Sequence, residues 1–178
     1  PNKLYSGIES LSDAYKAELK KLHKGRSGIY YRISQRDKDK NLNHPLLDAV
    51  VIAIRWSQVE PNPGEFDFNV LRNQVEKWSK FGKGVVITLQ LYGQAVDDAI
   101  TLPWVYESGV EPVWFKGGGQ AKGQKIRIPK VWDESFLINR LEPLVAAFAK
   151  EFNGHPNVWY ITVSFGHIGN IAAQPSRD

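Results

Sequence analysis

The sequence predicts an α/β fold built around a parallel sheet, and three observations support this. Four short segments rich in β-branched and aromatic residues are predicted as strands: residues 28–33, 49–56, 84–91 and 158–165. The second and third are nearly continuous apolar runs, which is typical of strands covered on both faces of a parallel sheet. Segments with helical spacing lie between strands, and this alternation favours right-handed parallel crossovers.

Three segments carry apolar residues at helical spacing. The first covers residues 11–22, and the second covers residues 69–81, where Gly82 suits the end of a helix. The third and longest runs from about residue 133 to 152. Pro143 is expected either to kink this last helix or to mark a late start, because proline cannot donate a backbone hydrogen bond in a helix interior.

A long loop is predicted between the third strand and the last helix. Loops of more than about 15 residues are uncommon unless they are functional or disordered. This one contains Trp104, Trp114 and Trp132, together with the glycine-rich stretch of residues 116–124. Its aromatic content is too high for a simple linker.

The composition excludes several classes of function. The 178 residues include no Cys, which rules out disulfide scaffolds, thiolate zinc sites and cysteine nucleophiles. The four His are scattered and no nucleotide-binding fingerprint occurs, so we expect neither a metal nor a cofactor. The 23 Lys and Arg are interleaved with 19 Asp and Glu, which gives little support to nucleic-acid binding. No apolar run approaches the roughly 20 residues of a membrane span. We therefore expect no membrane partner. The sequence does not distinguish an extracellular from a cytoplasmic location.

The most informative stretch is residues 55–68, with the sequence RWSQVEPNPGEFDF. It resembles the segment after the second barrel strand in TIM-barrel glycoside hydrolases of the large retaining superfamily. The likeness is greatest to the β-galactosidase-like and β-amylase-like members, whose pattern there is W-x-x-x-E-P-x-x-G-x-Y/F-x-F/W. The third predicted strand, the Leu-Pro-Trp at 102–104 and the run from residue 129 to 158 resemble later elements of the same family.

The resemblance implies the first half, strands 1–4, of a TIM (β/α)8 barrel, with residues 1–178 as a single half-barrel unit. A complete barrel usually needs about 250 residues. An isolated half-barrel would leave two open strand edges and an uncovered sheet face. We therefore expect completion by a second copy, by another chain or by further C-terminal sequence. A small open α/β sheet is the remaining alternative.

In such a barrel, the chemistry lies at the C-terminal ends of the strands and in the loops after them. The candidate carbohydrate-binding residues at these positions are Arg55, Trp56, Gln90, Tyr92, Trp104 and Trp132. Aromatic rings beside polar groups suit sugars, whose C–H faces are apolar and whose edges carry hydroxyls. Trp104 and Trp132 are the better candidates for an aromatic platform under a sugar. The alternative role of Trp56 is packing in the core, and that of Arg55 is to support the barrel or a catalytic carboxylate. Glu60 is expected to hold its turn rather than to catalyse.

The acid/base position of the resembled family departs from the expected pattern. Retaining glycosidases use two carboxyl groups about 5–5.5 Å apart. The family places its acid/base Glu just after the fourth strand, where this chain has either His167 or Asn170, depending on the alignment. A histidine can act as an acid near neutral pH, whereas an asparagine cannot. The resemblance thus implies hydrolysis of O-glycosidic bonds in the complete barrel, with catalysis impaired. The alternative is a non-catalytic carbohydrate-binding or oligomer-forming half-barrel.

Overall fold

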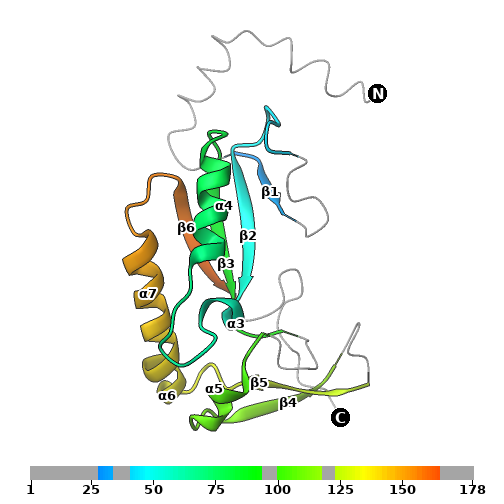
Figure 1. The fold of residues 1–178 in the computed structure, drawn as a ribbon. Helices are drawn as coiled ribbons and strands as arrows, with labels where there is room; N and C mark the ends of the chain where they lie inside the picture. The colour runs from blue at the N-terminus through cyan, green and yellow to red at the C-terminus, as the bar shows by residue number, and fades with distance from the viewer. Residues whose placement is uncertain (1–27, 34–40, 94–99, 118–122, 165–178) are drawn as a thin grey trace.

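The computed structural model describes residues 28–33, 41–93, 100–117 and 123–164 (Figure 1). The strands are β1 (Tyr30–Arg32), β2 (Ala49–Arg55), β3 (Gly84–Gln90), β4 (Pro112–Lys116), β5 (Lys125–Pro129) and β6 (Val158–Ser164). The helices are α3 (Trp56–Val59), α4 (Asn69–Ser79), α5 (Pro103–Glu107), α6 (Glu134–Phe136) and α7 (Glu142–Phe152), with the π-helical turn η2 (Leu137–Leu141) before α7.

Four parallel strands form the main sheet in the order β1-β2-β3-β6. They are the four strands that the sequence predicts, and the α/β fold is confirmed. The register pairs Arg55 with Gln90, and Gln90 with Ser164. The last residues of β2, β3 and β6 therefore lie in one row at the C-terminal edge of the sheet.

The core lies between the sheet and the two longer helices, α4 and α7 (Figure 1). Alternate strand residues enter it, because successive side chains of a strand point to opposite faces. These residues include Ile52, Ile54, Ile87 and Leu89, and the helices supply Leu71, Val75, Trp78, Leu144, Phe148 and Phe152. Burial of each such side chain contributes about 1.5–3 kcal/mol. The helix predicted over residues 69–81 is confirmed as α4.

The opposite face of the sheet carries aromatic rings near its N-terminal edge. A register irregularity between Val85 and Val86 leaves Trp159 as an additional residue in β6. The indole of Trp159 contacts Tyr30 edge-on, with ring centres 5.7 Å apart. The same indole covers Gly84, because a Cβ at that position would lie 2.1 Å from it. Glycine is required there by this close approach.

Two predictions about the second half of the chain are refined by the structure. The loop between β3 and the last helix contains the short helix α5 and an antiparallel hairpin of β4 and β5. The sequence analysis missed this hairpin, because the glycine-rich stretch that joins its two strands resembles a loop. Pro143 lies in the first turn of α7, directly after η2, so it marks a late start of the regular helix.

Two further predictions concern the helix at the start of the chain and the absence of a membrane span. The helix predicted over residues 11–22 lies outside the described residues. Among the helices that the structure describes, none is long and apolar enough to cross a membrane.

Candidate functional site

The candidate site lies at the C-terminal ends of the parallel strands, as the sequence analysis expects. Figure 1 shows α3, α5 and the β4–β5 hairpin beyond the arrowheads of β2 and β3. A backbone hydrogen bond of 3.1 Å from Ser57 N to Ile100 O joins the start of α3 to the segment that follows β3. This bond brings the two segments after β2 and β3 together at one end of the sheet.

The turn after β2 is built around a buried carboxylate. Glu60 is 6% exposed. Its Oε2 accepts a hydrogen bond of 2.7 Å from Trp56 Nε1, and its Oε1 accepts one of 2.8 Å from the backbone N–H of Gly64. Gly64 has a φ of +76°, a conformation that favours glycine. Both carboxylate oxygens thus hold the turn, which confirms the structural role expected for Glu60.

Trp56 lies in the core at the beginning of α3. It is 1% exposed. Its ring meets Trp104 edge-on at 5.8 Å and Phe136 edge-on at 5.8 Å. A ring buried in this way offers no face to a ligand, so direct contact of Trp56 with a sugar does not fit the structure.

Trp104 is half-buried on α5. The guanidinium of Arg140 lies over its ring, 5.5 Å from the ring centre. Its Nε1 is buried without a hydrogen-bond partner among the described residues. Unpaired buried donors are uncommon in folded proteins. The Trp104 ring therefore contacts both the Trp56 ring and the guanidinium of Arg140.

The three remaining residues at the strand ends differ in accessibility. Arg55 is exposed, and its backbone N–H donates a 3.1 Å hydrogen bond to Gln58 Oε1. Gln90 is half-buried and is the register partner of Arg55. Tyr92 is 8% exposed, and burial raises the pKa of its hydroxyl. The structure thus brings Arg55 and Gln90 together at the edge, and places Tyr92 inside.

Two tryptophans in the segment between β3 and α6 are the accessible aromatic rings of this end. Trp132 is 60% exposed and follows the core residue Val131. Trp114 on β4 is 49% exposed. The sequence analysis named Trp114 as part of the aromatic loop but did not select it. No local signal selects it, because Val113, Trp114 and Phe115 are all apolar and the sequence does not say which of them faces outward.

The two residues expected at the acid/base position, His167 and Asn170, lie outside the described residues. Within the described ranges, no group of three or more His, Asp or Glu is placed to hold a metal ion.

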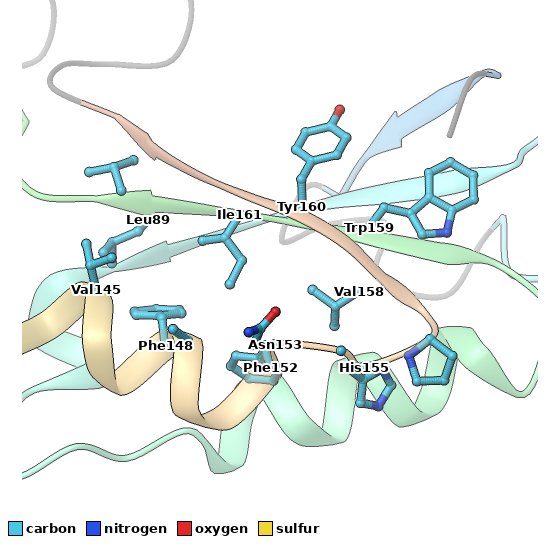
Figure 2. A pocket seen from close by; sticks show the side chains of 14 residues that line it. Leu89, Val145, Phe148, Phe152, Asn153, His155, Val158, Trp159, Tyr160 and Ile161 are labelled. Atoms are coloured by element: carbon cyan, nitrogen blue, oxygen red, sulfur yellow. The ribbon is translucent and has the colours of Figure 1, made fainter. Parts of the chain in front are cut away.

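A groove of about 400 Å³ lies elsewhere, between α7 and the edge strand β6 (Figure 2). Figure 2 shows Val158 and Ile161 pointing toward α7, whereas Tyr160 points away from it. The groove is lined largely by apolar side chains, including Leu89, Val145 and Phe148. None of the residues that the sequence predicts for the site lines it.

The fold defines the chain as an α/β protein with a parallel sheet. No protein-family model matches it, and no curated protein matches it. Its sheet and helices are similar to parts of two solved structures. One is a polyextremophilic β-galactosidase from the Antarctic haloarchaeon Halorubrum lacusprofundi, with a TM-score of 0.49, 17% identity, and coverage of 76% of this chain and 20% of that one. The other is a β-galactosidase from the psychrophilic Marinomonas ef1, with a TM-score of 0.48, 18% identity, and coverage of 76% and 21%. The chain spans about a fifth of the length of either β-galactosidase.

Proposed function

We propose that this chain forms the sugar-binding end of a glycoside-hydrolase-like barrel and supplies its first four strands. The observation that carries the proposal is the Trp56–Glu60–Gly64 turn at the C-terminal end of β2. The sequence of this turn resembles the glycoside-hydrolase pattern. Trp56 of this turn contacts Trp104 edge-on and directly follows Arg55 in the row of polar strand ends.

The proposed ligand is an oligo- or polysaccharide. Arg55 and Gln90 offer hydrogen-bonding groups at the strand ends, and Trp132 offers an exposed ring against which the C–H face of a sugar can pack. Trp104 borders this surface. Trp56 contacts Trp104, and both Trp56 and Tyr92 are buried, so neither is proposed to touch the sugar.

The proposal extends to catalysis of glycoside hydrolysis. In the completed barrel, hydrolysis would use a carboxyl pair supplied elsewhere, or an acid step by His167. The alternative function is carbohydrate binding without turnover, which the His167 and Asn170 positions in the sequence favour.

We further propose that a second copy, another chain or further sequence completes the barrel at strand β6. This strand is the last in the order β1-β2-β3-β6, so its outer backbone edge has no neighbouring strand among the described residues. The apolar groove of Figure 2 runs beside that edge, and Val145 and Tyr160 are each 44% exposed there. Open edges and apolar surface of this kind are usually covered in a stable protein.

Binding and hydrolysis assays test the proposal. The purified chain is titrated with a panel of neutral polysaccharides, incubated with aryl glycosides, and sized in solution. Trp132→Ala should weaken polysaccharide binding by about tenfold, the equivalent of about 1.4 kcal/mol. Phe81→Ala is the matched control, because Phe81 is an exposed aromatic residue (41%) that precedes the N-terminal end of β3. Equal loss in both variants would contradict the proposed site.

The other outcomes separate the alternatives. Turnover that disappears in His167→Ala supports catalysis by that residue, whereas binding without turnover supports the carbohydrate-binding alternative. Asn170→Glu in a complete barrel should restore or alter activity if Asn170 occupies the acid position. A stable oligomer that binds no sugar would rule out both carbohydrate functions and leave the assembly role.

A further inference from the structure

The β4–β5 hairpin is a stretch of the sequence in which positive charge has no acidic residue beside it. Residues 112–129, which include β4 and β5, contain Lys116, Lys122, Lys125 and Arg127 and no Asp or Glu. These four give the segment a local formal charge of +4. Lys122 lies outside the described residues, so the structural argument concerns the other three.

The hairpin register brings these cations onto one face. Lys116 is directly opposite Lys125, and Trp114 is directly opposite Arg127. The intervening positions are apolar and pack toward the core: Val113, Phe115, Ile126 and Ile128. Like charges directly opposite each other across two strands destabilise a hairpin. The Lys116–Lys125 pair is therefore unfavourable for folding alone.

Two of these cations lie over aromatic rings. The ammonium of Lys125 lies 4.7 Å from the centre of the Trp114 ring, and the guanidinium of Arg127 lies 4.1 Å from that of Tyr106. Within the described ranges, neither Lys116 nor Lys125 forms an ion pair. By contrast, Lys130 just beyond the hairpin lies 2.7 Å from Glu111.

We propose that the outward face of the hairpin, formed by Trp114, Lys116, Lys125 and Arg127, binds an acidic polysaccharide. This inference rests on the proposed sugar-binding function and names its substrate class: a sugar chain that carries carboxylate or sulfate groups. An anion near Lys116 and Lys125 relieves their mutual repulsion, and a ring of the sugar packs on the exposed part of Trp114. A saccharide is favoured over a nucleic acid because the hairpin lies at the same strand ends as the proposed sugar site, as Figure 1 shows.

Matched polysaccharides test the role of the ligand charge. The full chain is titrated at low salt with polygalacturonate and with its methyl ester, and with dextran sulfate and dextran. Each pair shares a backbone and differs in charge. We expect the charged member of at least one pair to bind about tenfold more tightly, and we expect this advantage to shrink as salt rises. The pair that shows the advantage distinguishes carboxylate from sulfate.

Matched variants test the role of the hairpin. Lys116→Gln/Lys125→Gln should remove most of the charged-ligand advantage. The control Lys80→Gln/Lys150→Gln makes the same change in net charge on the α4 and α7 side and should keep that advantage. Thermal unfolding verifies that both double variants are folded.

Each of four results would contradict the inference. Equal affinity for charged and neutral members, with neutral binding intact, refutes the acidic substrate class and leaves the proposed function standing. An equal loss in both double variants shows that net charge, not this hairpin, is responsible, and refutes the site. Tighter binding of single-stranded oligonucleotides than of any polysaccharide refutes the saccharide assignment. No binding to any polysaccharide refutes this inference together with the proposed function.

Discussion

The sheet–helix layer and the β4–β5 hairpin use the same residue types in opposite ways. Trp78 on α4 is 0% exposed in the core, whereas Trp114 on β4 is 49% exposed beside Lys125. β3 is buried along six of its seven residues, whereas the hairpin strands expose Trp114, Lys116 and Lys125 beside more buried apolar neighbours. The first region obtains its stability from apolar burial. The second keeps its polar and aromatic groups in contact with solvent, where they are available to a ligand.

This difference separates residues that hold the fold from residues that can carry function. Trp56 and Glu60 belong to the first class even though they lie at the end of the sheet proposed as the site, because both are buried and hydrogen-bonded to each other. Trp132 and Trp114 belong to the second class, since nearly half or more of each side chain is exposed. Four substitutions test whether this division is correct.

The largest effect is expected in the core. Leu71→Ala on α4 should lower the free energy of unfolding by about 2–5 kcal/mol, because it leaves a cavity at a residue that is 0% exposed. The neighbouring Val70→Ala is the control, since Val70 is 53% exposed and its truncation should change stability by no more than about 0.5 kcal/mol. Denaturant unfolding measures both. Similar values would contradict the assignment of this helix face to the core.

The second effect concerns the turn after β2. Glu60→Gln replaces one carboxylate oxygen by an NH₂ group, which must then face either the Trp56 N–H or the Gly64 N–H. One buried donor loses its acceptor, so stability should fall by about 1–3 kcal/mol. Glu65→Gln is the matched control, because Glu65 is exposed and accepts only from Asn62 Nδ2 in the described hydrogen bonds. An unchanged stability for Glu60→Gln would show that the turn does not depend on this carboxylate.

A smaller, pH-dependent effect is expected between α4 and α7. Hydrogen bonding to Arg72 lowers the pKa of Glu151, so the pair stabilises the folded state above the unfolded pKa of about 4.3. This stabilisation is lost as the pH falls through the lower, folded-state pKa. Arg72→Gln should therefore reduce stability at pH 6, and the difference from the wild type should narrow at pH 3. Chemical unfolding at the two pH values measures it, and a constant difference would contradict the linkage.

The smallest effect on stability is expected in the hairpin, and its sign is opposite. Lys116→Glu turns a pair of like charges into a pair of opposite charges across Lys125. We expect a gain of at most about 1 kcal/mol in the free energy of unfolding. Lys150→Glu on α7 controls for net charge. Any destabilisation confined to Lys116→Glu would show that the two lysines do not repel each other in the folded protein.

Much of the fold follows from local patterns in the sequence. The apolar runs predict β2 and β3 within one residue of their observed ends, and helical spacing predicts α4. These segments are predictable because each one's periodicity matches a single secondary structure and a single buried face. The β4–β5 hairpin was missed because it joins two five-residue strands through a glycine-rich stretch, which resembles a loop when its pairing is unknown.

The positions of the candidate site residues were predictable in part, for a similar reason. Position at a strand end is a local property, so Arg55 and Gln90 are found where the sequence places them. Exposure depends instead on which segments fold over a residue. Trp56 and Tyr92 are both buried, and Trp56 is covered by rings from other elements. The sequence around either residue does not predict this burial.

The sequence by itself determined the four parallel strands, the helix α4 and the structural role of Glu60. These properties depend on residue type and on spacing within one segment. Only the tertiary structure decided that Trp56 is buried while Trp114 and Trp132 are exposed, and that Lys116 lies opposite Lys125. The physical reason is that burial and cross-strand pairing arise between segments far apart in the chain, where the sequence pattern of either segment alone contains no information about the other.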